Sequence, residues 1–473
     1  MGLSSLISTA RSGINTYQVA TNVAAENIAN VNTPGYSRQS AVIESAPGTT
    51  VNGVTLGAGV MVSSVTRYYD GLMQKQLVNA NSTQSYDTQK STVLQQIEPV
   101  LNEVANDGLG AAISNFFGSW QDLSLNPGGI SERQVIMSNA QILTDNFHSV
   151  TQSLTSAADT QNASLVPLTE SINKTLTNIA QLNLQIKSIG EVSANPNEIK
   201  DQRDQMITSL AQRMGVKYTE NADGTTDVYL TKGNVNYNLV KGATAGSLTA
   251  VAEPGGNYVV TAHDAAGQST AIDGTVYSGQ EGGQLWATMQ LRDTIIPGYQ
   301  SQVDTLAKSI TDAVNGVQST GYSPTGATGQ NFFTPQSTVA GAAGKFSIDS
   351  GLTSGTIAAS GNASLPGDNS NALAMIGLVN AYTVPSGSPV ATFNSYYGSL
   401  VSTVGLDVQS SKTVVAQDTA FLKQLTTLRD SKSGVSLDEE LTNLMTYQRS
   451  YQASAKVLTT ATDMMDMALA LIR

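Results

Sequence analysis

The chain has 473 residues, enough for about two to four domains, and 40% of them are hydrophobic, which excludes disorder throughout. Its formal net charge of −12 argues against binding to nucleic acid or to an anionic membrane surface, because both require basic patches. It contains no cysteine, which excludes disulfides and thiol chemistry, and no segment approaches the ~18 apolar residues of a membrane-spanning helix.

The first part of the chain has a pattern typical of a helix that lies against another helix. Apolar and small residues recur there in steps of four and three: Leu3, Ile7, Ala10, Ile14, Tyr17, Thr21, Ala24 and Ile28. The helix is expected to end before residues 30–36, because Pro34 and Gly35 stop a helix and turn the chain. The first residues lack the basic start and continuous apolar stretch of a secretory signal peptide, so we expect export to need a dedicated apparatus.

Residues 68 to about 215 have a helical pattern, which is strongest between Leu165 and Ile189. A further helix is predicted to start near Pro196, with Asn195 as its cap. We interpret the charged residues of this helix as a solvated face: Asp201, Arg203 and Asp204, with Lys200 and Asp204 four residues apart.

From residue 216 to about 261 the apolar pattern changes to period two, with turn residues at 221–224, 232–234 and 253–256. This predicts a β-meander. Asp223 and Asp227 are expected to lie in a hairpin turn and not in a calcium loop, because the closing Glu of such a loop is missing. A long helix is predicted at about 284–318, and buried β segments at 332–333 and 346–348.

The C-terminal segment repeats the heptad of the N-terminal one. Its members are Leu437, Leu441, Leu444, Gln448, Tyr451, Ala455, Leu458, Thr462, Met465, Leu469 and Ile472. Ser436 and Glu439 have the spacing of a capping box, and Asp438 and Glu440 add negative charge where the helix dipole favours it. We expect Met465 to pack in the seam, whereas Met464 and Met467 lie off it and favour contacts with neighbours.

These elements predict an α+β multidomain fold in which the paired N- and C-terminal coiled-coil helices bring both ends of the chain together. A helical-bundle domain follows, with a β-rich domain inserted into it. The predicted domains are 1–60 with 435–473, 61–215 with 376–434, and 216–375, the last containing the helix at about 284–318.

The outer faces of the terminal helices carry few charges. Between residues 1 and 43 the only ones are Arg11, Glu26 and Arg38, and between 441 and 462 they are Arg449 and Lys456. A solvated coiled coil normally carries charge on its outside, so these faces suit contact with further helices. We therefore expect ends that are mobile in the single chain and become ordered inside an assembly.

No residue pattern predicts a catalytic or metal site. The only histidines are His148 and His263, and neither has the spacing of a zinc motif. The Gly-rich stretches lack both phosphate-binding patterns. The sequence therefore predicts a protein that is not an enzyme and requires no cofactor or metal.

Both ends of the chain carry motifs of a known family. Residues 29–39 (Ala-Asn-Val-Asn-Thr-Pro-Gly-Tyr-Ser-Arg-Gln) resemble the N-terminal signature of the bacterial flagellar rod, hook and hook-associated proteins, and residues 436–458 resemble their C-terminal signature. Three further segments are similar to a hook-associated member of that family: 36–39, 201–207 leading into 215–218, and 367–374.

The resemblance implies a structural protein at the junction between hook and filament, outside the cell, exported by the flagellar type III apparatus without a cleaved signal peptide. It implies as partners the hook protein, hook-associated protein 3, other copies of the chain in a ring, and an export chaperone at the C-terminal helix, with no nucleic acid and no membrane. The assembly interface is then expected at Leu3, Ile7, Ile14, Tyr17, Ile28, Asn32, Pro34, Gly35, Tyr36, Leu437, Leu441, Leu444, Tyr451, Leu458, Met465, Leu469 and Ile472.

Three alternatives have different signatures. A hook or distal rod structural protein would share both ends, but the length and the helical region 68–215 argue against it. A secreted coiled-coil adhesin would carry charged outer faces and a signal peptide. An enzyme in the middle domain would need a catalytic set of residues in 216–375.

Overall fold

The computed structural model describes residues 3–51, 54–101, 108–191, 195–233, 235–272, 282–381, 383–385 and 390–470. The helices are α1 (Leu3–Ala29), α2 (Gly71–Leu101), α3 (Leu109–Leu125), α4 (Ile130–Glu191), α5 (Asn197–Arg213), α6 (Gly283–Gln290), α7 (Ile296–Gln318), α8 (Ser370–Gly377), α9 (Phe393–Ser433) and α10 (Leu437–Ala470). The strands are β1 (Gln39–Ser45), β2 (Thr49–Val51), β3 (Val54–Leu56), β4 (Val60–Arg67), β5 (Lys217–Glu220), β6 (Thr226–Lys232), β7 (Val235–Lys241), β8 (Thr244–Ala245), β9 (Ser247–Ala252), β10 (Tyr258–His263) and β11 (Ser269–Ile272).

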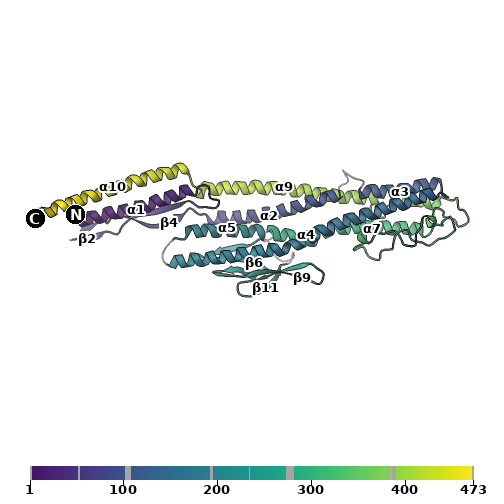
Figure 1. The fold of residues 1–473 in the computed structure, drawn as a ribbon, viewed down its shortest axis with the longest axis horizontal. Helices are drawn as coiled ribbons and strands as arrows, with labels where there is room; N and C mark the ends of the chain where they lie inside the picture. The colour runs from purple at the N-terminus through teal and green to yellow at the C-terminus, as the bar shows by residue number, and fades with distance from the viewer. Residues whose placement is uncertain are drawn as a thin grey trace.

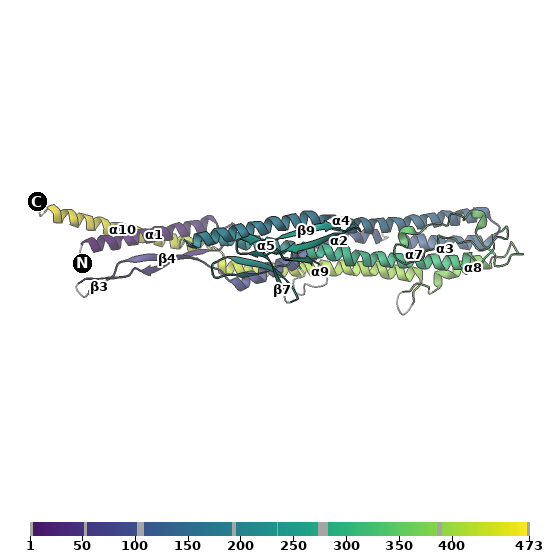
Figure 2. The same ribbon diagram turned by 90° about the horizontal axis from the view of Figure 1, so that it is seen from below.

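The molecule is an elongated rod with both termini at one end (Figure 1). Helix α1 pairs with α10 at that end, and α2 pairs with α9 in the next section. The long helix α4 continues to the opposite end, where it lies beside α3 and α7 (Figure 2). The predicted fold class is confirmed: the protein is mostly helical, its N- and C-terminal helices are paired, and its sheets are small and antiparallel.

The strands form separate small sheets. β1 and β4 make an antiparallel ribbon beside α1, with a register shift between Val42 and Ile43, and β2 pairs with β3. The inserted strands form a four-stranded sheet in the order β5-β6-β7-β8 and a three-stranded sheet in the order β11-β10-β9. The predicted hairpin turn is confirmed between β5 and β6, where Asn221 and Thr225 close the turn and Gly224 adopts φ +81°.

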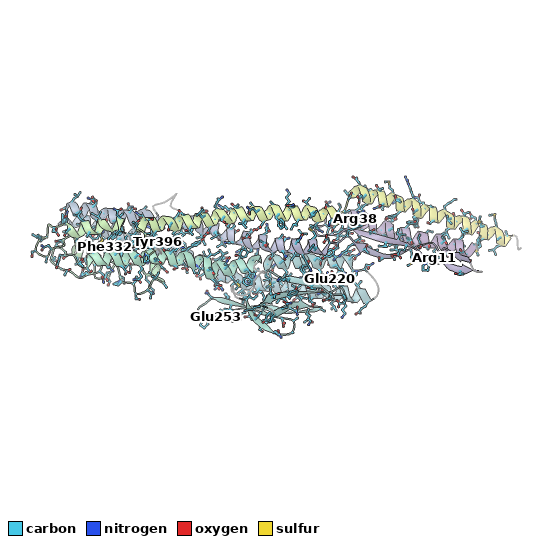
Figure 3. The ribbon with its side chains drawn as sticks, turned by 180° about the vertical axis from the view of Figure 1, so that it is seen from behind. Arg11, Arg38, Glu220, Glu253, Phe332 and Tyr396 are labelled. Atoms are coloured by element: carbon cyan, nitrogen blue, oxygen red, sulfur yellow. The ribbon has the colours of Figure 1, made fainter. Side chains whose placement is uncertain are left out.

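Two large hydrophobic cores lie along the rod. The first is at the far end and joins α3, the first half of α4, α7 and the first half of α9, and Figure 3 shows Phe332 and Tyr396 there. The second packs α5, α6 and the second half of α4 against the β sheets. The segment 216–375, expected as one β-rich domain, contributes strands to the second core and residues 332–359 to the first.

Other predicted features of the middle section are present with local differences. The helix expected at about 284–318 is present as α6 and α7, joined by a π-helical turn at Leu291–Ile295. Of the two buried β segments, Phe333 and Ile348 form an isolated antiparallel bridge. The expected cap Asn195 is not used, because α5 begins at Asn197 and has no side-chain cap hydrogen bond. Within the described ranges, no helix is both long and apolar enough to cross a membrane.

Candidate assembly surface and the polar junction at its base

Small side chains line the contact between α1 and α10. The buried residues of α1 are Ala10, Gly13, Thr16, Ala20, Val23, Ala24 and Asn27. A Cβ atom added to Gly13 would lie 2.7 Å from Oγ of Ser454 on α10, and Ala461 of α10 is also buried. The two helices therefore approach closely through small residues rather than through interlocking large apolar side chains.

On α1, most of the buried residues come one position before a residue of the heptad that predicted the pairing. Leu3, Ile7, Ile14, Tyr17 and Ile28 are only half-buried. The β1–β4 ribbon accounts for the displacement, because it covers a second side of α1: Thr16 Oγ1 donates to the Val60 carbonyl at 3.0 Å, and Ser12 Oγ to the Ala58 carbonyl at 3.3 Å. Helix α1 thus lies between α10 and the ribbon.

On α10, most of the predicted apolar seam is not covered by α1, so the expectation that it packs between the two helices is wrong for these residues. The exposed fractions are 45% for Leu437, 47% for Leu441, 38% for Tyr451, 44% for Met465 and 57% for Leu469. Leu444 and Leu458 are half-buried, and Ile472 lies outside the described residues. Met464 and Met467 are exposed beside them, as expected for residues off the seam.

A buried polar cluster fixes the base of the helix pair. The side chain of Asn27 is completely buried and makes four hydrogen bonds. Its Oδ1 accepts from Tyr36 Oη and from the Gln39 backbone N–H, both at 2.9 Å. Its Nδ2 donates to the Gln39 carbonyl at 2.8 Å and to Oε2 of Glu440 at 3.0 Å. One asparagine therefore ties together α1, the start of β1 and the start of α10.

Glu440 has a larger role than the helix-start charge assigned to it from the sequence. It is only 3% exposed, and its Oε1 accepts from Nε of Arg38 at 2.7 Å, while Arg38 also pairs with Glu439 at 2.9 Å. The Arg38 backbone N–H donates to the Ser433 carbonyl at the end of α9. Figure 3 shows Arg38 where α9 meets α10. The acidic start of α10 thus contributes Glu440 to a buried ion pair with Arg38, which joins the two ends of the chain.

Asp201, Arg203 and Asp204 of α5 are also buried, so the interpretation of these residues as a solvated face is wrong. Asp201 accepts from the Ser37 backbone N–H at 2.8 Å and pairs with Arg67 at 2.7 Å, and Arg67 reaches Asp204 at 3.0 Å. Burial raises the pKa of the Asp204 carboxyl, and the neighbouring guanidinium groups oppose that rise. Lys200 pairs with Glu220 rather than with Asp204. This network joins β4 and the segment after α1 to α5.

The turn that carries the N-terminal motif is held in place by side chains of α5 and α9. Gly35 adopts φ +81°, a conformation that favours glycine, and the Gln205 side chain of α5 donates to the Pro34 carbonyl. Arg429 of α9 donates to the Tyr36 carbonyl at 3.1 Å. The predicted interface residues Asn32 and Pro34 are exposed on this turn, whereas Tyr36 is buried.

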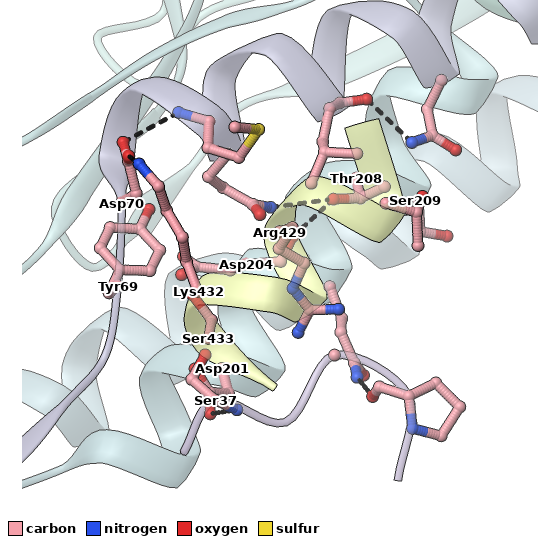
Figure 4. A pocket seen from close by; sticks show the side chains of 18 of the residues that line it. Ser37, Tyr69, Asp70, Asp201, Asp204, Thr208, Ser209, Arg429, Lys432 and Ser433 are labelled. Carbon is pink, nitrogen blue, oxygen red and sulfur yellow. Dashed lines mark hydrogen bonds and ion pairs between the residues drawn. The ribbon is translucent and has the colours of Figure 1, made fainter. Parts of the chain in front are cut away.

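A cavity of about 480 Å³ lies beneath the turn, between the start of α2, α5 and the end of α9 (Figure 4). Asp70 pairs with Lys432 across it at 3.2 Å, and Gln74 donates to Thr208 at 3.3 Å. These groups satisfy one another, and the cavity contains neither a histidine nor a paired nucleophile and base. We therefore interpret the lining of the cavity as part of the structural contact between α2, α5 and α9.

Neither His148 nor His263 lies in an arrangement typical of a catalytic site. His148 is exposed on α4, and His263 on β10 forms hydrogen bonds with the hydroxyl groups of Thr249 and Ser269. In the part of the chain that the structure describes, no group of three or more His, Cys, Asp or Glu side chains could hold a metal ion. The notable geometry of the molecule is therefore a helix pair with an uncovered apolar side, anchored by a buried polar junction.

Comparison with known proteins gives concordant results. Residues 94–333, just over half of the chain, match the model of the flagellar hook-associated protein FlgK helical domain. Residues 7–36 match the flagella basal body rod protein model, and 429–471 match the C-terminal model of the flagellar basal body rod FlgEFG proteins. The rod models thus cover only the two ends, whereas the helical-domain model covers the middle.

Whole-chain relatives agree with the helical-domain match. The flagellar hook-associated protein 1 of Salmonella typhimurium is 29% identical over 99% of this chain and 100% of its own length. That of Bacillus subtilis is 27% identical over 97% of this chain and 96% of its own length. The structure of the flagellar hook junction protein FlgK from Burkholderia pseudomallei has the same fold, with a TM-score of 0.66 at 18% identity over 76% of this chain and 100% of that one.

Proposed function

The chain belongs to the family of the flagellar hook-associated protein FlgK, and from that premise we propose that its terminal helix pair is the element through which it assembles. It is a structural component of the bacterial flagellum at the hook–filament junction, outside the cell, and not an enzyme. What remains to be assigned is which surface of the chain makes the contacts between subunits.

The observation that carries the proposal is the uncovered side of α10. Leu437, Leu441, Tyr451, Met465 and Leu469 expose 38–57% of their surface while the opposite side of the helix packs on α1. A row of apolar side chains along one helix is typical of a surface that becomes buried against a partner. Within residues 441–462 the only charges are Arg449 and Lys456, so desolvation of that part of the surface costs little.

We propose as partners the hook protein on one side, hook-associated protein 3 on the other, and further copies of the chain in a ring. Before assembly, an export chaperone would cover the same apolar side of α10. The half-buried residues of α1 and the exposed turn residues Asn32 and Pro34 would complete the surface. We further propose that residues 1–60 with 435–473 form the terminal domain, 61–215 with 376–434 the helical domain, and 216–375 the inserted part.

Two aspartate substitutions on the exposed side of α10 test this proposal. Leu441→Asp and Met465→Asp place a charge on the surface without entering the α1–α10 contact, so the chain should fold and be exported. Cells carrying either variant should release flagellin into the medium and fail to swim. Val251→Asp, on a residue of β9 that is 61% exposed, is the matched control and should swim normally. Normal motility of both α10 variants would refute the proposal.

The runner-up from the sequence, a hook or distal rod protein, makes a different prediction in vitro. Such a protein would polymerise alone into long tubes. A junction protein should stay as single chains or short assemblies until hook ends are added. Electron microscopy of the purified chain at increasing concentration distinguishes the two, and long hook-like tubes would favour the hook protein.

A further inference from the structure

The contact between α2 and α9 contains a stretch without an apolar core. Residues 83–90 of α2 and 412–424 of α9 include no fully buried side chain, and we call this stretch the α2–α9 gap. On one side of it the large core at the far end reaches Val408 of α9. On the other side, Met73, Leu77 and Ala80 of α2 pack on Leu425 of α9. Helix α9 is therefore anchored at both ends of the gap, and neither helix has a fully buried side chain within it.

Two carboxyl groups meet inside the gap. Asp87 of α2 and Asp418 of α9 are within hydrogen-bonding reach of each other, and both side chains are half-buried. Oδ2 of Asp418 is buried, and no N–H or hydroxyl group of the described residues donates to it. A proton on Asp87 supplies the missing donor. Without that proton, two negative charges face each other in a stretch where neither helix has a fully buried side chain.

Among the residues that the structure describes, no fixed counter-charge faces the pair across the gap. Besides Asp418, the charged group whose field reaches Asp87 is Lys90, which lies on α2 itself. On its other side, α2 makes neutral contacts at this level, from Gln89 to Gln161 of α4 and from Tyr86 to Gln290 of α6. The other charges of α9 in this stretch are Lys412 and Lys423, and both are exposed.

We propose that the α2–α9 gap is a proton-dependent latch, in which Asp87 and Asp418 share one proton that holds the helices together. When the proton is lost, the middle of α9 separates from α2 while its two ends stay in place. The chain thereby has a section of adjustable stiffness between its terminal helices and its far end.

The direction of the pH dependence follows from the burial of Asp87 beside Asp418. Burial, followed by the hydrogen bond to Asp418, raises the pKa of Asp87 from 3.8 to about 6. The closed gap therefore binds a proton that the open gap releases. The latch is most stable below about pH 3.8, and this stabilisation is lost as the pH rises from there to about 6.

Hydrogen exchange of the full chain tests the proposal. Between pH 5 and pH 8, the protection factor of amides in 412–424 should fall roughly tenfold, which corresponds to one pH unit of preferential proton binding. Amides in 400–408, which lie in the far core, should keep theirs. Equal protection of 412–424 at the two pH values would overturn the proposal, and so would a parallel loss in 400–408.

Substitutions distinguish the shared proton from other causes of a pH-dependent change in hydrogen exchange. In Asp418→Asn, the amide donates permanently to Asp87, so protection at pH 8 should equal that at pH 5. Asp87→Asn is the mirror variant and should behave in the same way. Asp159→Asn, on an exposed residue of α4, is the control and should keep the wild-type pH dependence. A pH dependence that persists in either gap variant would contradict the latch.

Discussion

Replacing Asn27 by aspartate should weaken the junction between the two ends of the chain in a pH-dependent way. The new carboxylate keeps the hydrogen bonds from Tyr36 and from the Gln39 N–H, but it loses the two that Nδ2 donates to the Gln39 carbonyl and to Glu440. Each lost bond costs about 1 kcal/mol. The new carboxylate also faces Glu440 at the position where Nδ2 now lies 3.0 Å away.

The repulsion is limited by proton uptake. Protonating one of the two carboxyls costs about 1.4 kcal/mol for each pH unit above a pKa of about 4, and a protonated group recovers one hydrogen bond. For Asn27→Asp we therefore expect a destabilisation of about 4–5 kcal/mol at pH 7 and about 2–3 kcal/mol at pH 5. The change is isosteric, so the loss is electrostatic and not a packing defect.

The measurement is the free energy of local opening of α1 and α10, taken from hydrogen exchange or from urea-dependent proteolysis of the full chain. The two large hydrophobic cores should be unaffected, because local opening does not involve them. Asn15→Asp, on an exposed residue of α1, adds the same charge outside the cluster and should change little. If the two variants behave alike, or if Asn27→Asp costs the same at pH 5 and pH 7, the reasoning is refuted.

Further predictions concern the same end of the rod. Gly13→Ala should destabilise the α1–α10 contact by about 1 kcal/mol because the new Cβ meets Ser454 Oγ, and Ser454→Ala in the same chain should restore stability, measured by exchange of α1 amides. Gly35→Ala should cost about 1–2 kcal/mol, seen as faster proteolysis of the turn, because its φ is +81°. The hydrogen bond that protonated Glu26 donates to Glu198, followed by burial, raises the pKa of Glu26 to about 7, so the native protein loses stability as pH rises from about 4.5 to 7. Glu26→Gln should therefore stabilise it at pH 8, by about 1 kcal/mol once solvent screening is allowed for, with no gain at pH 4, in thermal unfolding at both pH values.

The pairing of the two ends was predictable because a heptad at each end has few other structural explanations. Which side of each helix is covered was not predictable. A heptad reports where large apolar residues recur, whereas the contact uses Gly13 and Ser454, whose small size gives no hydropathy signal. The β1–β4 ribbon also competes for α1, and no pattern within the helix reveals that competitor.

The polar junction escaped prediction for a different reason. Asp201, Asp204 and Glu440 have the local spacing of solvated helix charges, and their partners are remote in sequence: Arg67 is 134 residues from Asp201, and Asn27 is 413 residues from Glu440. A signal was nevertheless present. Only 13% of the residues are charged, so acids concentrated at two helix starts in such a chain call for an explanation beyond solubility.

The distribution of small and large side chains supports the proposal that the free end of the helix pair is buried against neighbouring subunits. The face of α10 that meets α1 contributes small side chains such as Ser454 and Ala461, which remove little apolar surface from water. Specific stability is concentrated at the base, in the buried bonds of Asn27 and Glu440. Towards the termini, the larger apolar groups of α10 remain in solvent. A helix pair whose orientation is fixed at its base loses less conformational freedom when its apolar side is buried, which favours the proposed docking.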